Sequence, residues 1–497
     1  MDEILEKLNS VIQRIYLEDD IPWVIGYSGG KDSTAALQVV WNALNELPEE
    51  QRNKKAVHVV STNTLIESPV ISKWVADSID KLRKKSEEEN MPIVPHHLRP
   101  QWNDTFWVNL LGRGYPYPRP TMRWCTDRLK IKPANKFVQE VVSAYGEVIL
   151  VLGTRKAESA NRARTMEYYE KKRAREYLSP NGSIQNELVF SPLEDWSHTD
   201  VWNYLLSHEN PWGQSNEALL EMYQGATMDF DGEEALVMNA SSPAWGKSRF
   251  GCWMCTMVEK DKSMVAMIRN DAEKRWMTPL MEFRNEIADA EKDRDRRDFR
   301  RMTGSTLLYK GRLVHGPYKK EVREGWLRRL LEIQCLIREI GPQGFEDIEL
   351  ITMQELNCIR HIWLNDKHEF DDSLPIIYEE VTGEKFIPTE MTGQTSFGSA
   401  EWNLLSSVCK ALYPDEELLF ETVARIVDIE SQATEQKARR GVVKSVETQL
   451  KKGFYKNEQD AQQYAMDKIQ RKKKMGASYD VEAEDNSQMS IFEEENA

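Results

Sequence analysis

The sequence contains no apolar run near the ~20 residues that a membrane-spanning helix requires. Its 497 residues include only six cysteines, at scattered spacings, which argues against the disulfide framework of a small secreted domain. The formal net charge is −15, so the chain lacks an overall basic surface for nucleic acid, and any such surface must be local. The N-terminal residues lack the basic and apolar regions of a signal peptide. These absences predict a cytoplasmic protein, with no membrane association, of about two or three domains.

A glycine pair stands between a short apolar segment and a helical pattern near the N-terminus. Residues 21–26 predict a buried strand, residues 28–33 have the sequence SGGKDS, and residues 35–41 predict a helix. Glycines let the backbone turn tightly and point successive N–H groups at an anion, and the N-terminal end of the helix dipole adds to this attraction. The serine hydroxyls and the Lys31 ammonium can contact phosphate oxygens. We therefore expect a nucleotide-binding loop, although Ile25 excludes a Walker A motif.

Apolar segments of strand length alternate with helical patterns from residue 20 to about residue 210. This alternation predicts an α/β fold with a doubly wound parallel sheet, which binds ligands at the carboxyl ends of its strands. A mostly helical, charged region follows from about residue 261. The expected strands are residues 21–26, 56–61, 91–96 and 148–153, and the expected helices include an amphipathic N-terminal helix and residues 70–82.

Polar residues follow two of the expected strands. Thr62 and Asn63 come after the second, where they would either contact the nucleotide or form an ordinary polar turn. Gly153 ends the fourth, and Arg155 and Arg162 follow it. Guanidinium groups at this position suit a phosphate-rich substrate, although a charged helix facing solvent would have the same composition.

A helix entry is expected further along the chain. Ser197 or Thr199 would cap this helix, with Asp200 in its first turn. His198 is interpreted as part of the helix entry rather than as a catalytic base.

Two cysteines form a C-x-x-C pair at Cys252 and Cys255. Such a pair brings two sulfurs to one centre, which can be a metal site, a redox pair or a structural feature. Cys125 lies among four basic residues between positions 123 and 132, which we expect to favour its thiolate, and it could supply a third sulfur. Three thiolates suit an iron–sulfur cluster, or a zinc ion with a fourth ligand from elsewhere. The other cysteines, Cys335, Cys358 and Cys409, are expected in helical cores.

Several motifs together resemble a known family. SGGKDS resembles the PP-loop of ATP pyrophosphatases and of adenylyl-sulfate reductases. With five further segments, it resembles DndC, the PP-loop, phosphoadenylyl-sulfate-reductase-like component of bacterial DNA phosphorothioation systems. The match covers about residues 20–260. The further segments are VSTNTLIESP (60–69), FWVNLLGRGYP (106–116), RWCTDRLKIKP (123–133), GTRKAESANRAR (153–164) and CWMC (252–255).

The resemblance implies a sheet of the PP-loop ATP pyrophosphatase type and an ATP-dependent sulfurtransferase. Such an enzyme helps to replace a non-bridging oxygen of the DNA backbone with sulfur. The implied cofactors are ATP, Mg²⁺ and a 4Fe-4S cluster, and the implied partners are DNA, a cysteine desulfurase that donates sulfur, and other phosphorothioation-system proteins. The candidate catalytic residues are Lys31, Asp32 and Cys125; the cofactor-binding residues are Ser28, Gly29, Gly30, Lys31, Asp32, Ser33, Thr62, Asn63, Gly153, Arg155 and Arg162; and the metal ligands are Cys125, Cys252 and Cys255.

Two other functions stay open. The first is the reduction of adenylyl sulfate or phosphoadenylyl sulfate in sulfur assimilation, although the chain lacks the tandem Cys-Cys and the C-terminal cysteine nucleophile of those reductases. The second is a non-catalytic, nucleotide-sensing scaffold, against which the intact SGGKDS speaks.

Charge segregates strongly in the second half of the chain. Residues 437–474 carry 12 lysines and arginines against 4 acidic residues, and the basic runs at 293–301 and 310–320 give local positive density that suits DNA or a salt-bridged surface. Residues 476–497 hold seven acidic residues and no basic ones, which predicts disorder. Their segment Gln488–Phe492 resembles the peptide that docks on the bacterial sliding clamp. The expected domains are residues 1–260 for nucleotide and sulfur chemistry, 261–435 (helical), 436–475 (basic helical appendage) and 476–497 (acidic tail).

Overall fold

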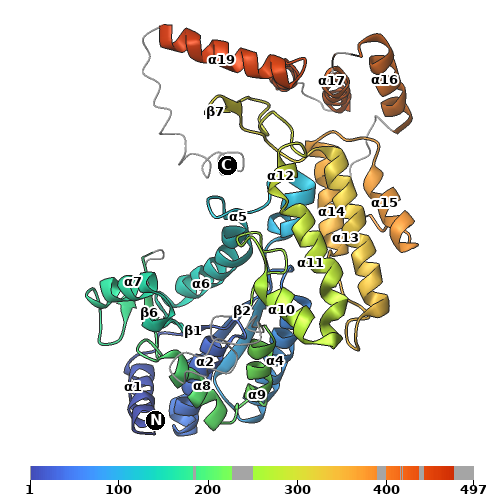
Figure 1. Ribbon diagram of the computed structural model, residues 1–497. Helices are drawn as coiled ribbons and strands as arrows, with labels where there is room; N and C mark the ends of the chain where they lie inside the picture. The colour runs from blue at the N-terminus through green and yellow to red at the C-terminus, as the bar shows by residue number, and fades with distance from the viewer. Residues whose placement is uncertain are drawn as a thin grey trace, which may run out of the picture. The chain divides into compact units, whose positions relative to one another are not determined.

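A computed structural model describes residues 2–182, 186–226, 250–388, 399–414, 416, 418–435 and 441–474 (Figure 1). The chain divides into two compact units. Unit 1 comprises Met1–Gln101 and Cys125–Met281, and unit 2 comprises Trp102–Trp124 and Glu282–Ala497. Within the described part of the chain, no helix is long and apolar enough to cross a membrane.

This division differs from the expected boundary at residue 260, because residues 102–124 belong to the second unit. Two buried indoles explain the difference. Trp107 donates a hydrogen bond to the Leu350 carbonyl (2.7 Å), and Trp363 donates one to the Leu111 carbonyl (2.8 Å). The early segment is therefore tied into the helices of unit 2.

A six-stranded sheet forms the centre of unit 1, in the order β3-β2-β1-β4-β6-β5. The first five of these strands run parallel, and only β5 is antiparallel to its neighbour β6. The α/β class and the four expected strands are confirmed, whereas β5 and β6 were not predicted. The strands are β1 Trp23–Gly26, β2 Val57–Thr62, β3 Ile93–Leu98, β4 Val148–Val151, β5 Ser179–Pro180 and β6 Glu187–Phe190.

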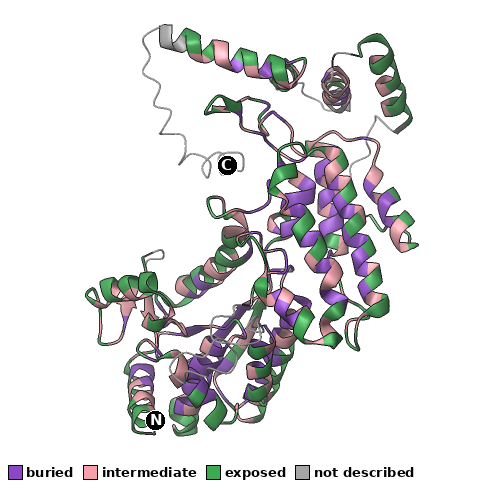
Figure 2. Ribbon diagram, in the orientation of Figure 1, coloured by how far each residue is buried: buried purple, intermediate pink, exposed green. Residues whose placement is uncertain are grey.

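Helices flank this sheet, and the core of unit 1 lies between the two layers (Figure 2). Trp23 of β1 and Trp41 of α2 are almost fully buried, as expected where a parallel sheet is covered by helices. Ser197 caps α8 through a reciprocal capping box with Asp200, which confirms one of the two expected caps. The helices are α1 Asp2–Glu18, α2 Lys31–Asn45, α3 Glu49–Arg52, α4 Pro69–Glu88, α6 Lys132–Tyr145, α7 Ala160–Glu170, α8 His198–Ser207, α9 Asn216–Gly225 and α10 Lys262–Asn270, with the short α5 Trp124–Thr126 and α11 Thr278–Ile287 at the unit boundaries.

Unit 2 is mostly helical, as predicted, and α13 and α14 carry many of its buried residues (Figure 2). The cysteines of α13, α14 and α16 are partly exposed rather than buried, so the expectation that they lie in the core is wrong. The described part of the basic appendage, residues 441–474, is helical, and residues 488–492 lie outside the described residues. The elements are α12 Ala290–Asp293, β7 Leu308–Tyr309, β8 Arg312–Leu313, α13 Lys320–Ile340, α14 Met353–His361, α15 Ser373–Thr382, α16 Ser399–Leu412, α17 Leu419–Glu435, α18 Val442–Lys452 and α19 Glu458–Lys474.

Candidate nucleotide and thiol site

The SGGKDS loop joins the carboxyl end of β1 to the start of α2. Gly29 has a φ of +71°, a conformation that L side chains rarely adopt, and a Cβ there would lie 2.6 Å from the Val75 side chain. The indole of Trp74 donates a hydrogen bond to the Gly29 carbonyl (3.1 Å). Backbone conformation and close packing therefore both require glycine at this position.

Hydroxyl groups hold the loop closed on itself. The Ser33 hydroxyl donates to the Gly30 carbonyl (3.0 Å) and accepts a hydrogen bond from the Ser28 N–H (3.2 Å). Gly30 precedes the first residue of α2 and supplies no side-chain cap. The first turn of this helix thus faces the loop with its N–H groups, which is the arrangement that binds phosphate.

A buried ion cluster stands beside the loop. The Asp32 carboxylate accepts from the Lys31 ammonium (2.7 Å) and from the Arg155 guanidinium (2.8 Å), and Arg155 also donates to the Trp196 carbonyl (3.2 Å). Only 2% of Arg155 is exposed. Gly153 lies so close to the loop that a Cβ there would be 2.4 Å from the Asp32 carbonyl oxygen. The end of β4 is therefore in contact with the SGGKDS loop, and the cofactor-binding roles of Gly153 and Arg155 stay predictions.

Two other predicted residues are engaged elsewhere. Arg162 pairs with Glu158 one turn earlier (3.7 Å), and its side chain is largely exposed. The Asn63 side chain accepts a hydrogen bond from the Leu65 N–H (2.9 Å), which is an Asx-type turn at the end of β2. Thr62 is the last residue of that strand. The structure thus favours the structural alternatives for Arg162 and Asn63.

Two loop contacts were missed by sequence reasoning because their residues lie far along the chain. The Tyr223 hydroxyl accepts a hydrogen bond from the Lys31 N–H (3.3 Å), and the Lys31 ammonium lies 5.5 Å from the centre of the Tyr223 ring. The charges of the loop region also affect the pKa of His198. Burial lowers the pKa of His198 to about 4, and the positive charges of Lys31 and Arg155 contribute to this shift.

The C-x-x-C segment is attached to the chain that follows β2. The Trp253 N–H donates to the Ile66 carbonyl (3.0 Å), Cys252 forms a β-bridge with Glu67, and the sulfur of Cys252 lies 3.7 Å from the Thr64 hydroxyl. Because β2 is parallel to β1, the end of β2 and the nucleotide loop lie at the same edge of the sheet. The cysteine pair is therefore held on the same side of unit 1 as the loop.

The three predicted thiols share one electrostatic neighbourhood. Burial raises the pKa of Cys252 to about 11, and Lys130 opposes this shift. The pKa of Cys125 is also raised, first by burial and then by the nearby Cys255. The expectation that basic neighbours favour the Cys125 thiolate is therefore wrong in this structure, because the cost of burying the charge outweighs them.

The described residues hold no group of three or more His, Cys, Asp or Glu side chains that could bind a metal ion. The pKa of Cys125 is influenced by Cys255 and that of Cys252 by Cys125, so the three thiols lie near one another. Three thiolates suit an iron–sulfur cluster, or a zinc ion with a fourth ligand from elsewhere. The metal-ligand assignment of Cys125, Cys252 and Cys255 stays a prediction.

Comparisons with known proteins agree with this geometry. Residues 22–258 match the phosphoadenosine phosphosulfate reductase domain. Two uncharacterized proteins of Methanocaldococcus jannaschii, MJ0066 and MJ0973, are 26% identical over 53% of the chain and 25% identical over 36% of it. The chain covers 42% and 34% of those relatives, which is less than half of their length.

Among solved structures, the U34-tRNA thiolase NcsA from Methanococcus maripaludis with its [4Fe-4S] cluster matches 58% of this chain and 80% of its own. The sequence identity is 16% and the TM-score is 0.28. The family match coincides with the sheet, the SGGKDS loop and the cysteine pair described above. Residues 22–258 of this chain therefore form a phosphoadenosine phosphosulfate reductase domain, an enzyme domain of the PP-loop ATP pyrophosphatase type.

Proposed function

We propose that this protein is an ATP-dependent sulfurtransferase that places sulfur on a backbone phosphate of DNA. The observation that carries this proposal is the attachment of the C-x-x-C segment to the end of β2, at the sheet edge that bears the nucleotide loop. The bound ATP and the group that carries sulfur must both lie close to the same phosphorus atom of DNA. The resemblance to DNA phosphorothioation proteins supports DNA as the acceptor.

Activation begins with a poor leaving group, a phosphodiester oxygen. That oxygen attacks the α-phosphorus of ATP, the bond to the β-phosphate breaks, and pyrophosphate leaves with the electron pair. Lys31 and Arg155 neutralise the charge that develops on pyrophosphate, which the loop N–H groups bind. The Asp32 carboxylate, partly exposed between these two cations, would exchange Lys31 for Mg²⁺.

Sulfur transfer follows on the activated phosphate. Sulfide attacks phosphorus, a phosphorus–sulfur bond forms, and AMP leaves with the electron pair of the broken phosphorus–oxygen bond. The overall exchange involves no net oxidation or reduction. A cysteine desulfurase, together with a thiol reductant that releases its sulfur as sulfide, would supply the sulfur.

Three thiols would hold an iron–sulfur cluster in this scheme. Cys125, Cys252 and Cys255 are the protein ligands that we assign to it. When bound, a cluster with three cysteine ligands has one iron without a protein ligand, and this iron can bind sulfide. Thr64 and Lys130 adjoin Cys252, where they would stabilise its thiolate form.

The test is an anaerobic reaction with ATP, Mg²⁺, sodium sulfide and plasmid DNA. Pyrophosphate release and phosphorothioate dinucleotides, detected by mass spectrometry after nuclease digestion, are measured together. Cys255→Ser should lose the sulfur product, whereas Cys335→Ser, in α13 of unit 2, should retain it. DNA that contains no sulfur in any reaction, with normal ATP turnover, would contradict the proposal.

Reduction of adenylyl sulfate or phosphoadenylyl sulfate is the second candidate, because the matching family model bears that name. It predicts sulfite release from these nucleotides with a dithiol reductant, and no dependence on DNA. Sulfite production at the same rate in the presence and absence of DNA would favour this reaction.

Two partner surfaces belong to the same proposal. The basic helices α18 and α19 would contact DNA, and Gln488–Phe492 would bind the bacterial sliding clamp. A pulldown with purified clamp compares the intact chain with Phe492→Ala. Equal retention of both proteins would exclude this binding segment.

A further inference from the structure

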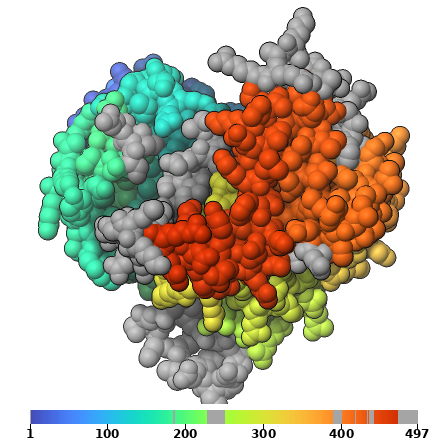
Figure 3. All heavy atoms as spheres, turned by 90° about the horizontal axis from the view of Figure 1, so that it is seen from above, coloured from blue at the N-terminus to red at the C-terminus, as the bar shows by residue number. Residues whose placement is uncertain are grey.

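Unit 2 contains a polar cavity of about 1300 Å³. Its lining includes ten lysines and arginines against seven aspartates and glutamates, although the chain as a whole carries a net charge of −15. The lining comes from Arg113 and Tyr115 of the early segment, the α12–β7 region, the start of α13, the turn after α14, and helices α16 to α19. In Figure 3 these C-terminal helices, in orange and red, occupy much of the viewed face. A local excess of positive charge in an acidic protein points to an anionic ligand.

At least five of these ten cations form ion pairs with acidic residues within the described part of the chain: Arg294, Arg297, Arg300, Lys320 and Arg425. Arg300 pairs with Asp298 (2.6 Å) and Glu421 (2.9 Å), and Arg294 pairs with Glu458 (2.8 Å). These pairs account for much of the basic run at 293–301, and they support the salt-bridged alternative for it. They tie the α12–β7 region to α17 and α19, so they stabilise the cavity walls.

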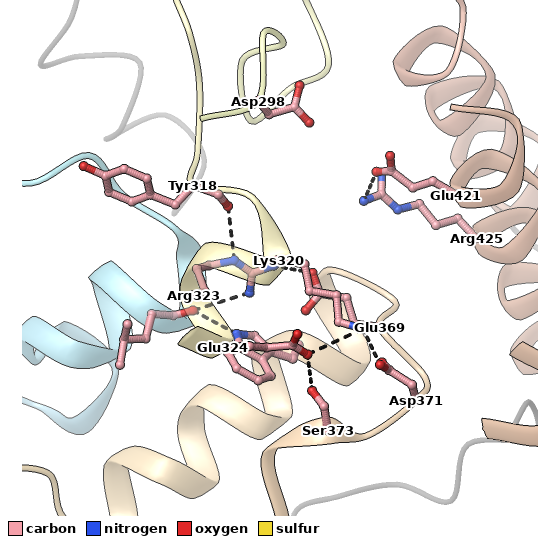
Figure 4. Close-up of polar contacts among 12 residues, drawn as sticks. Asp298, Tyr318, Lys320, Arg323, Glu324, Glu369, Asp371, Ser373, Glu421 and Arg425 are labelled. Atoms are coloured by element: carbon pink, nitrogen blue, oxygen red, sulfur yellow. Dashed lines mark hydrogen bonds and ion pairs between the residues drawn. The ribbon is translucent and has the colours of Figure 1, made fainter. Parts of the chain in front are cut away.

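Further ion pairs surround the cavity in Figure 4. Arg425 pairs with Glu421 on α17, across from Lys320 and Arg323 at the start of α13. Arg323 pairs with Glu369, and Lys320 pairs with Asp371. Lys320 and Arg425 belong to the cavity lining, so these ion pairs hold two of its cations in place.

Lys367 differs from the paired cations of the cavity. Among the described residues, its ammonium has no hydrogen bond and no ion pair; it shares this with the exposed Lys319, but Lys367 is partly buried in the lining. Burial lowers the pKa of Lys367 to about 7, and the charges of Arg323 and Arg425 lower it further than Glu369 and Asp298 can offset. A partly buried ammonium without a partner is costly, and a bound anion would supply that partner.

Aromatic and amide groups line the same cavity. Trp402 packs edge-on against Phe420, with ring centres 4.5 Å apart, and the Lys320 ammonium lies 5.4 Å from the Trp402 ring. Gln449 and Gln462 offer both donors and acceptors. A cavity that contains both an aromatic ring and an unpaired ammonium suits a ligand that carries both a ring and a phosphate.

We propose that the cavity of unit 2 binds a nucleotide unit, with Lys367 contacting its phosphate and Trp402 stacking on its base. The ligand is a free nucleotide or a nucleotide within a nucleic-acid strand, because both present the same groups. The site belongs to unit 2, and its assignment does not depend on sulfur transfer in unit 1.

Chemical modification of lysines tests this proposal on the full-length protein. Reductive methylation at pH 7.5, read by peptide mass spectrometry, measures the reactivity of Lys367, of Lys31 in the nucleotide loop, and of the exposed Lys385 of unit 2 as a control. We expect AMP or a 5′-phosphorylated oligonucleotide of four nucleotides to slow the modification of Lys367 at least fivefold, with Lys385 unchanged. Since Lys31 reports on the loop in the same digest, binding in unit 1 is distinguished from binding in unit 2.

The two probes also distinguish the source of the nucleotide. Protection by AMP supports a free nucleotide, and protection by the oligonucleotide alone supports a strand. Lys367→Gln should weaken binding of the protecting probe about tenfold or more, whereas Lys385→Gln should leave it unchanged. Lys367 that reacts equally with and without both probes, while Lys31 is protected, overturns the proposal.

Discussion

The nucleotide loop of unit 1 and the cavity of unit 2 both contain cations, but Lys31 of the loop has an acidic partner and Lys367 of the cavity has none among the described residues. Lys31 lies on a glycine-rich turn and pairs with Asp32, which Arg155 also contacts. Lys367 lines its cavity without an ion pair among the described residues. In the loop, an internal carboxylate therefore neutralises the lysine charge, whereas in the cavity the Lys367 ammonium would gain a negative partner only from a bound ligand.

The contrast also shows how a site can be built. Six consecutive residues create most of the loop, and the neighbouring strand end adds Gly153 and Arg155. The cavity draws its lining from segments as far apart in the sequence as Arg113 and Gln462. Consecutive residues leave a motif in the sequence, and dispersed residues do not.

Removing the loop cation should have the largest effect. Lys31→Ala should lower ATP-dependent pyrophosphate release about 100-fold, because one charged contact to the leaving group is lost. Lys171→Ala, an exposed lysine just after α7, serves as the control. A rate within twofold of the wild type in both variants would mean that the loop does not act on pyrophosphate.

Substitutions of the two predicted arginines, Arg155 and Arg162, should have different effects on turnover. Arg155→Met should reduce turnover about 10- to 100-fold, since it removes a buried contact to Asp32 and exposes the loop to rearrangement. Arg162→Met should change turnover less than twofold, because its side chain pairs with Glu158 near solvent. Steady-state kinetics on both variants checks this, and equal losses would show that α7 also binds the substrate.

The backbone conformation and close packing of Gly29 should contribute to the stability of unit 1 against unfolding. Gly29→Ala should destabilise unit 1 by about 1–3 kcal/mol, because the added Cβ meets Val75 at 2.6 Å in a left-handed conformation. Gly146→Ala shares the positive φ but has open space around it, so it measures the conformational part alone. Thermal unfolding compares the two variants, and equal losses would remove the packing argument.

The smallest effect concerns His198 and acid stability. Its pKa in the folded protein, about 4, lies below the ordinary value of 6.5, so the unfolded chain binds the proton more readily. The contribution of His198 to stability is complete above pH 6.5 and is lost as the pH falls from 6.5 towards 4. His198→Gln should therefore flatten the pH dependence of unfolding in this window, measured by denaturant titration. His361→Gln, in unit 2, should leave it unchanged.

The sequence predicted the sheet strands and the turn between β1 and α2, and it placed Gly153 and Arg155 at a strand end, because each follows from local pattern or from the geometry of parallel strand ends. It also placed His198 at a helix entry, as observed. It missed Tyr223, whose hydroxyl contacts the Lys31 N–H from 192 residues away, and the effect of Lys31 and Arg155 on the pKa of His198. It also misjudged Cys125, whose basic neighbours in sequence do not outweigh its burial. Burial and long-range packing are properties of the fold, so a local charge pattern cannot supply them.

In unit 2 the sequence predicted helices and positive density but no cavity. Three arginines of the run at 293–301 form ion pairs with acidic residues of α12, α17 and α19. They are Arg297, Arg300 and Arg294. Lys367 carries no signal in its own segment. The pKa of Lys367 is lowered first by burial and then by the charges of Arg323 and Arg425, which lie on other helices.

The central claim is that Cys125, Cys252 and Cys255 form one centre beside the nucleotide loop. Iron, sulfide and zinc analysis of anaerobically purified protein tests it directly, with Cys125→Ser and Cys335→Ser side by side. We predict about four iron and four sulfide per chain in the wild type and in Cys335→Ser, and their loss in Cys125→Ser. One zinc with no iron, or iron that Cys125→Ser retains in full, would contradict the account.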